Sequence, residues 1–125
     1  MAKVLVVEDN PANMTLATFL LESVGHTVLK AQDAEAGVGL ARSERPDLVL
    51  MDIQLPGMDG LSATGILKAD AETRDIPVIA LTALAMKGDE ERIREGGCEA
   101  YLSKPISVGK FIETVRHFLG TEEKR

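Results

Sequence analysis

The sequence has few of the residues that build disulfides, nucleic-acid interfaces and membrane spans. Cys98 is the only cysteine among 125 residues, so no internal disulfide can form. Lysine and arginine number 14 against 20 acidic residues, and the net charge of −6 disfavours binding to nucleic acid or to an anionic membrane. The longest apolar stretch, residues 77–86, is about half as long as a membrane-spanning helix. These absences favour a cytoplasmic protein without membrane insertion.

Aromatic residues are also scarce, because the chain has no tryptophan, one tyrosine and three phenylalanines. A hydrophobic fraction of 45% must therefore form a mainly aliphatic core, and 125 residues suffice for one domain. We expect that domain to cover residues 1–120, followed by a short polar tail over 121–125. No DNA-binding or catalytic output domain is expected after it.

Apolar runs and helical periodicities alternate five times along the chain. Pro11 after Asn10, for example, is typical of a helix start. The expected strands are Val4–Val7, Thr27–Ala31, Leu48–Met51, Val78–Leu81 and Glu99–Leu102, and the expected helices lie near 11–24, 34–43, 59–70, 87–95 and 107–119. This alternation predicts an α/β fold with a doubly wound parallel sheet covered by helices on both faces.

The helix near 87–95 is polar, with Ile93 as its one clear apolar anchor. We expect it to be weakly held and able to change its packing. Its charged residues are typical of a solvated face, with a partner contact as the alternative. The helix near 34–43 contains Gly37 and Gly39, and each glycine lowers the stability of a helix by about 1 kcal/mol relative to alanine. The sequence offers no physical explanation for these two glycines.

Three acids follow directly on expected strands: Glu8 and Asp9 after the first, and Asp52 after the third. Parallel strands end at one edge of the sheet, where open α/β sheets bind ligands. Packed carboxylates repel one another unless a cation lies among them. Oxygen ligands with room for water suit Mg²⁺, so the pattern predicts a magnesium site.

A hydroxyl and an ammonium are expected at the same edge, on Thr82 after the fourth strand and on Lys104 after the fifth. A carboxylate, a metal, a hydroxyl and an ammonium are the groups that phosphoryl transfer requires. In this hypothesis Asp52 attacks phosphorus, while Lys104 and Thr82 bind phosphoryl oxygens.

Together, Glu8-Asp9, the segment from Asp52 to Gly60, Thr82-Ala83 and Lys104-Pro105 resemble the receiver domain of two-component response regulators. The resemblance covers residues 3–119. It implies a five-stranded flavodoxin-like sheet of order 2-1-3-4-5 with five helices. It also implies a set of roles: Mg²⁺ on Glu8, Asp9, Asp52 and the backbone carbonyl of Gln54; phosphorylation of Asp52 by a kinase histidine; a cis Lys104–Pro105 peptide; and a switch formed by Thr82 and Tyr101.

The segment from Met86 to Tyr101 is especially similar to the DivK type of stand-alone receiver, which regulates cell division and polarity in bacteria. The resemblance implies a histidine kinase or histidine phosphotransfer protein as phosphodonor, which we expect to dock near Met14, Leu16 and Phe19. It also implies a downstream protein partner at the 86–101 face, regulated by phosphorylation.

Three other interpretations compete with this one. A phosphatase of the haloacid dehalogenase type needs a second acid two residues after its nucleophile, where this chain has Gln54. A phosphate-independent binding module does not require the complete set of site residues. A receiver that is part of a hybrid kinase stays open.

Some single residues have simpler interpretations. Tyr101 is expected as a switch, with plain packing as the alternative, and Asp59 as a cap or turn residue rather than a metal ligand. Cys98 is expected to be structural, and His26 and His117 to be surface residues.

Overall fold

The computed structural model describes residues 2–83 and 87–120, and the side chains of these residues except 87–89. Five strands alternate with five helices in this part of the chain. The elements are β1 (Lys3–Val7), α1 (Pro11–Ser23), β2 (Thr27–Ala31), α2 (Ala34–Glu44), β3 (Leu48–Asp52), α3 (Gly60–Ala69), β4 (Val78–Thr82), α4 (Lys87–Glu95), β5 (Ala100–Ser103) and α5 (Val108–Leu119). Every expected element is therefore present, with ends shifted by a residue or two.

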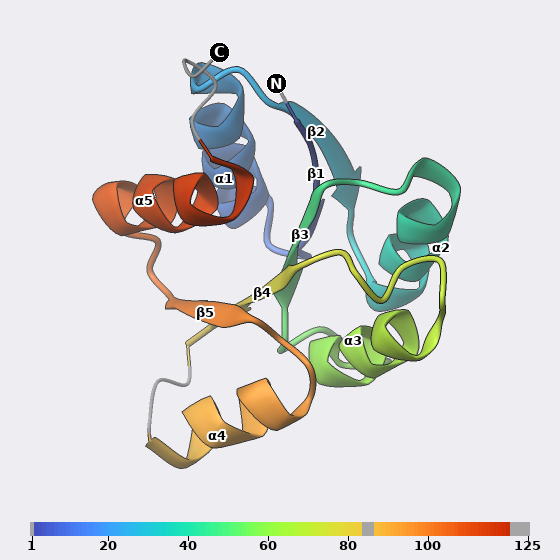
Figure 1. Cartoon of the computed structure of the whole chain (residues 1–125). Helices are drawn as coiled ribbons and strands as arrows, with labels where there is room; N and C mark the ends of the chain where they lie inside the picture. Colours follow the sequence, from blue (N-terminus) through green and yellow to red (C-terminus); the bar gives the residue numbers. More distant parts are fainter. Residues whose placement is uncertain (1, 84–86, 121–125) are drawn as a thin grey trace.

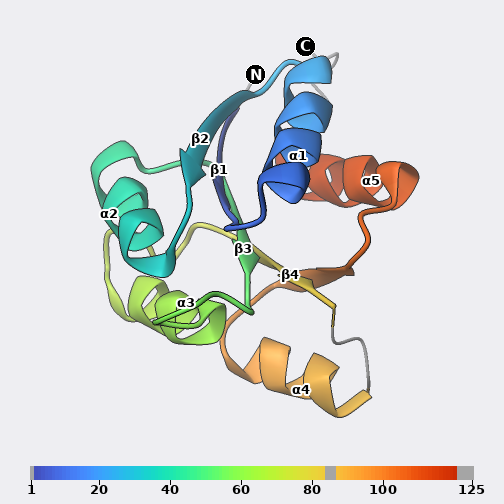
Figure 2. The same cartoon turned by 180° about the vertical axis from the view of Figure 1, so that it is seen from behind.

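The strands form one parallel sheet of order β2-β1-β3-β4-β5, which confirms the predicted doubly wound, flavodoxin-like fold. Helices α1 and α5 cover one face, and α2, α3 and α4 cover the other (Figure 1; Figure 2 gives the view from behind). Because β1 and β3 are neighbours while their helices lie on opposite faces, the strand order reverses there. Ligands bind at such a switch point, at the carboxyl ends of the strands.

The core is built from the central strands, because β3 and β4 are buried at every position. Strands that are covered on both faces have continuous aliphatic sequences, and β3 and β4 have such sequences. Phe111 of α5 is the one phenylalanine that is fully buried, so the core is aliphatic as expected. Within the described ranges, no helix is long and apolar enough to cross a bilayer.

Side-chain caps fix the starts of two helices near the sheet edge. Asn10 accepts a hydrogen bond from the Asn13 N–H at 3.0 Å and begins α1. Asp59 accepts from the Ser62 N–H at 2.7 Å and begins α3, which confirms its expected capping role. Both caps satisfy a backbone N–H that the helix leaves unpaired.

Gly37 allows α2 to pack closely on β1. A Cβ atom at this position would lie 2.7 Å from Val7 Cγ2, whereas one at Gly39 would meet nothing within 4 Å. Gly37 is therefore explained by helix–strand packing, while nothing in the structure explains Gly39.

The expectation that His26 is a surface residue is wrong. After α1 the chain reverses at Gly25, which has a φ of +93°, and His26 is buried against the amino-terminal end of β1. Its Nδ1 accepts a hydrogen bond from the Ala2 N–H at 3.1 Å. His117 is exposed, as expected.

Candidate functional site

Three carboxylates meet at the carboxyl edge of β1 and β3. Glu8 follows the last residue of β1, and Asp52 is the last residue of β3. Both are 1% exposed, whereas Asp9 is exposed. One carboxylate oxygen from each of the three lies within 4.8 Å of the others, so the acids that the sequence placed together do lie together.

Lys104 brings an ammonium group to the two buried acids. Its Nζ lies 3.0 Å from Asp52 Oδ2 and 3.2 Å from Glu8 Oε1. The Lys104 N–H donates to the Thr82 carbonyl oxygen at 2.8 Å, and the Lys104–Pro105 peptide is cis as expected. The backbone of Lys104 is thus fixed to the end of β4 while its side chain reaches β1 and β3.

The mutual contacts shift two protonation equilibria. Burial raises the pKa of Glu8 above its usual value, and the nearby Asp52 carboxylate adds to this, although the Asn10 N–H on Glu8 Oε2 opposes it. Burial alone would lower the pKa of Lys104, but the hydrogen bond and negative charge of Asp52, aided by Glu8, outweigh it and raise that pKa. Lys104 is therefore a permanent cation at neutral pH.

The acidic group fits a divalent cation. Glu8 Oε1 is buried and accepts no hydrogen bond, although Lys104 lies near it. One ammonium faces three carboxylates, so the group has negative charge in excess. Oxygen ligands, one of them exposed, match a small hard cation that keeps part of its water shell.

Gln54 is an exposed residue that is hydrogen-bonded both to Asp52 and to Ala83. Its backbone N–H donates to Asp52 Oδ1 at 2.9 Å, and its side-chain Oε1 accepts from the Ala83 N–H at 3.0 Å. Binding of metal by its backbone carbonyl stays a prediction. Sequence reasoning missed the bond to Ala83, and no signal in the sequence indicates it.

Two further predicted residues lie on β4 and β5. Thr82 ends β4 and is fully buried, and Tyr101 on β5 pairs in register with Ala80 and is half-buried. Side chains two apart on a strand point to the same face, so Thr82, Ala80 and Tyr101 share one face of the sheet. Tyr101 packs there against the cluster that contains Ala80 and Ile93.

The close packing of α3 supports Asp52 and was also missed by sequence reasoning. A Cβ atom at Gly60 would clash with the Asp52 carbonyl oxygen and would lie 2.6 Å from Ile53 Cα. A glycine directly after the capping Asp59 was the available signal. Only glycine allows the first turn of α3 to lie this close to the end of β3.

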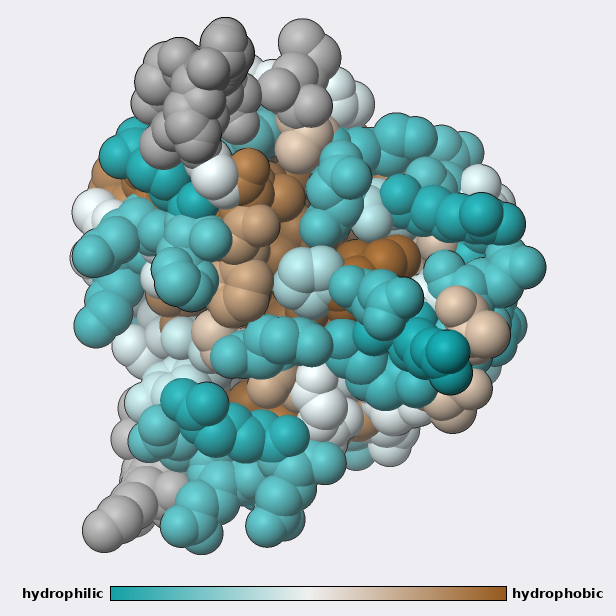
Figure 3. Space-filling view, in the orientation of Figure 1, coloured by the Kyte–Doolittle hydropathy of each residue, from teal (hydrophilic) through white to brown (hydrophobic). Residues whose placement is uncertain are grey.

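The expected partner face, residues 86–101, is described from residue 87 on, so Met86 lies outside the described residues. Ile93 is the buried anchor of α4, while Glu91, Arg92, Arg94 and Glu95 are exposed. Figure 3 shows this helix, at the lower left, as a hydrophilic surface. The expectation of a single apolar anchor therefore agrees with the described side chains.

Cys98 is buried and 3.8 Å from Thr64 Oγ1. Burial raises the pKa of its thiol, and the charge of Glu99 adds to the shift. These features agree with the expected structural role.

Comparison with known proteins places this arrangement in a family. The model of the response regulator receiver domain matches residues 4–116. The polar-differentiation response regulator DivK of Brucella anthropi is 58% identical over 117 residues, which cover 94% of this chain and 95% of that protein.

Solved structures agree in fold. The receiver domain of a sensor histidine kinase from Pseudomonas aeruginosa PAO1, with a magnesium ion coordinated in its active site cleft, has a TM-score of 0.88 at 38% identity and covers 96% of this chain and 98% of its own. The chemotaxis protein CheY4 of Vibrio cholerae has a TM-score of 0.89 at 23% identity, with 94% and 98% covered, and shows the fold alone. The chain belongs to the response regulator receiver domain family and is similar to DivK polar-differentiation regulators.

Proposed function

We propose that this receiver accepts a phosphoryl group on Asp52 from a histidine kinase or a histidine phosphotransfer protein, in a Mg²⁺-dependent reaction. The observation that carries the proposal is the contact of one ammonium, Lys104 Nζ, with both buried carboxylates, Asp52 and Glu8. A carboxylate at the sheet edge beside a positioned ammonium group can attack phosphorus. The same ammonium can then compensate the negative charge of the phosphoryl group that the carboxylate has accepted.

In the transfer, an Asp52 carboxylate oxygen forms a bond to phosphorus while the bond from phosphorus to the donor's histidine nitrogen breaks. The nitrogen keeps the electron pair of the broken bond and takes up a proton from solvent. Lys104 then binds an oxygen of the new phosphoryl group, and the Thr82 hydroxyl binds another. The bond from the Gln54 N–H holds Asp52 Oδ1, which leaves Oδ2 on the Lys104 side.

Glu8, Asp9, Asp52 and the backbone carbonyl of Gln54 would hold Mg²⁺. When bound, the ion compensates charge on the phosphoryl oxygens. The excess negative charge of the group and the buried Glu8 Oε1 without a hydrogen bond support this assignment.

Phosphorylation is proposed to act as a switch through Thr82 and Tyr101. The phosphoryl group draws Thr82 toward Asp52, and the space released on that face of the sheet lets Tyr101 turn inward. Their common face and the half-burial of Tyr101 support this sequence of events. A shift from mostly inactive to mostly active needs about 5 kcal/mol of differential stabilisation.

The downstream partner is proposed to bind the 86–101 face, where α4 is anchored through Ile93 and otherwise hydrophilic. A helix held by one apolar side chain changes its packing at low cost. The similarity to DivK supports a partner in cell-division or polarity control, such as a kinase, as the regulated protein.

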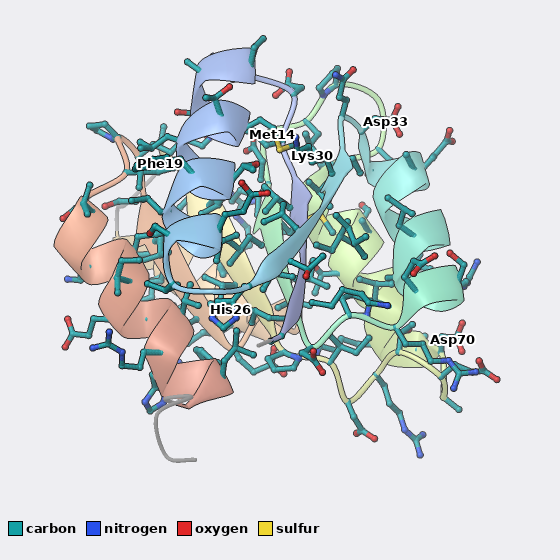
Figure 4. The ribbon with its side chains drawn as sticks, turned by 90° about the horizontal axis from the view of Figure 1, so that it is seen from above. Met14, Phe19, His26, Lys30, Asp33 and Asp70 are labelled. Atoms are coloured by element: carbon teal, nitrogen blue, oxygen red, sulfur yellow. The ribbon has the colours of Figure 1, made fainter. Side chains whose placement is uncertain are left out.

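The phosphodonor is proposed to dock on α1 beside the acids. Phe19 is 66% exposed, and with Leu16, Pro11, Ala12 and Thr15 it lines a shallow apolar hollow directly after Asp9 and Asn10. Met14 does not line this hollow: Figure 4 shows it on the β2 side of α1, whereas Phe19 lies on the side of α5. The docking proposal therefore rests on Leu16 and Phe19.

As a signalling domain the protein is proposed to assist only the phosphorylation and dephosphorylation of its own Asp52, in the cytoplasm, and not to turn over a separate substrate. The phosphate-independent binding module is the competing function. It does not require the contacts that Lys104 makes with Asp52 and Glu8.

The test is the intact mass of the protein after incubation with acetyl phosphate and Mg²⁺. We expect one phosphoryl adduct, stable in acid and labile in base, that is absent in Asp52→Asn and in the presence of a chelator. Asp47→Asn is the matched control, because Asp47 is an exposed aspartate directly before β3, at the opposite end of that strand. An adduct of equal amount in Asp52→Asn contradicts the proposal.

A further inference from the structure

Gln54 connects the ends of two neighbouring strands beside the acidic group. Its backbone N–H holds Asp52 Oδ1 at 2.9 Å, while its carboxamide oxygen accepts from the Ala83 N–H at 3.0 Å. Asp52 pairs in register with Leu81, so Ala83 lies just beyond the end of β4 on the neighbouring strand. The side chain of Gln54 thus spans the gap between β3 and β4 next to Thr82.

The Ala83 N–H points into this gap, because it donates to the side chain of Gln54, and the backbone N–H of Gln54 donates to Asp52. An oxygen of a phosphoryl group on Asp52 would be a charged acceptor in the same gap. Charged acceptors bind an N–H about twice as strongly as a neutral carboxamide oxygen does. The phosphoryl group is therefore able to displace Gln54 from Ala83. Both residues are exposed, so water can solvate the released carboxamide.

We propose that Gln54 is a latch, meaning that its carboxamide occupies the Ala83 N–H in the unphosphorylated protein and must leave before the phosphoryl group is fully bound. The inference rests on the proposed phosphorylation of Asp52. In this role Gln54 is a positioning residue that slows phosphorylation, because one existing hydrogen bond breaks on the way to the product.

The latch is tested with two substitutions. Gln54→Met keeps an unbranched side chain of similar length but removes the carboxamide oxygen. Gln54→Glu keeps an acceptor and adds a negative charge. Gln32→Met is the matched control, because Gln32 is an exposed glutamine after β2, the outer strand of the sheet.

Two properties are measured for each protein. The first is the chemical shift and the solvent-exchange rate of the Ala83 amide proton, measured by NMR without phosphodonor. A substitution that altered only the chemistry of phosphorylation would leave both values unchanged. The second is the rate of phosphorylation by acetyl phosphate with Mg²⁺.

We expect Gln54→Met to move the Ala83 amide proton upfield, to speed its exchange and to raise the phosphorylation rate about two- to tenfold, the range that loss of one ordinary hydrogen bond allows. Gln54→Glu should keep the amide bonded and slow phosphorylation, since its carboxylate repels the incoming anion. Gln32→Met should match the unmodified protein in both measurements.

An unchanged Ala83 amide in Gln54→Met overturns the latch, and so does a changed amide with an equal or lower phosphorylation rate. Both results leave the proposed function intact. Failure of the unmodified protein to become phosphorylated overturns the proposed function, and the latch with it.

Discussion

Lys104 Nζ lies 3.0 Å from Asp52 Oδ2, across the end of β4, to which the backbone of Lys104 is hydrogen-bonded through Thr82. The same ammonium is 3.2 Å from Glu8 Oε1, so one cation compensates two carboxylates that are each 1% exposed. Removing one partner from a buried charge group leaves the others without compensation, which costs more than the contact itself is worth.

Substitution of Lys104 by methionine should therefore destabilise the protein in metal-free buffer. We expect a loss of about 2 kcal/mol in the free energy of unfolding at neutral pH, less than for a fully buried pair because Lys104 is partly exposed. Mg²⁺ should restore part of the loss, since a bound cation replaces the missing charge. Urea unfolding with and without Mg²⁺ measures both effects.

Lys3→Met is the control for Lys104→Met. Lys3 pairs with Glu44 at 3.3 Å, but both side chains are well exposed, so the loss should stay below about 1 kcal/mol. Equal stability of the Lys104→Met and unmodified proteins would show that Lys104 does not compensate the buried acids.

Gly60 should tolerate no side chain. Gly60→Ala places a Cβ atom against the backbone of Asp52 and Ile53, and we expect a loss of about 3 kcal/mol in the free energy of unfolding, because backbone yields less readily than a side chain. Gly65→Ala in the same helix meets nothing within 4 Å and should stabilise the protein by about 1 kcal/mol. Thermal unfolding of the two variants should shift in opposite directions, and a shift in the same direction would contradict the packing argument.

Asp70 should contribute to the loss of stability in acid. It lies near the end of α2 in Figure 4, whereas Asp33 lies at the start of that helix. The N–H of Glu72 and the Arg42 guanidinium, at 2.9 Å, lower the pKa of Asp70 below its usual 3.8.

Because the folded state holds this carboxyl ionised, it stabilises the fold above pH 3.8, and the stabilisation is lost as the pH falls through the lower folded-state value. Asp70→Asn should therefore show a flatter fall of unfolding free energy with decreasing pH. Asp75→Asn, at an exposed aspartate of the same connection, is the substitution control. Identical slopes in the unmodified protein and Asp70→Asn would contradict the effect.

Much of the fold follows from local patterns. The apolar runs after Lys3, Asp47 and Pro77 are long enough to predict strands buried on both faces. Asn10 and Asp59 predict helix starts, because each side chain accepts a hydrogen bond from a backbone N–H within the next four residues. The meeting of Glu8, Asp9 and Asp52 follows in turn, because parallel strands end at one edge.

Other features depend on contacts between residues distant in sequence. His26 is buried because the chain turns at Gly25 and places His26 against the residues at the start of β1. A single histidine has no periodic pattern around it that would predict this burial. The need for glycine at position 37 arises from Val7, thirty residues earlier. The bond from Ala83 to Gln54 depends on one side-chain conformation, which the sequence pattern does not specify.

The measurement that tests the central claim most directly locates the phosphoryl group. The protein is incubated with acetyl phosphate and Mg²⁺, the acyl phosphate is reduced with borohydride to the alcohol, and the digested peptides are sequenced by mass spectrometry. We predict homoserine at position 52, and none at Asp9, Asp47 or Asp59. Reduction at another acid, or at none while an acid-stable phosphoryl adduct is present, would contradict the assignment of Asp52 as the phosphoacceptor.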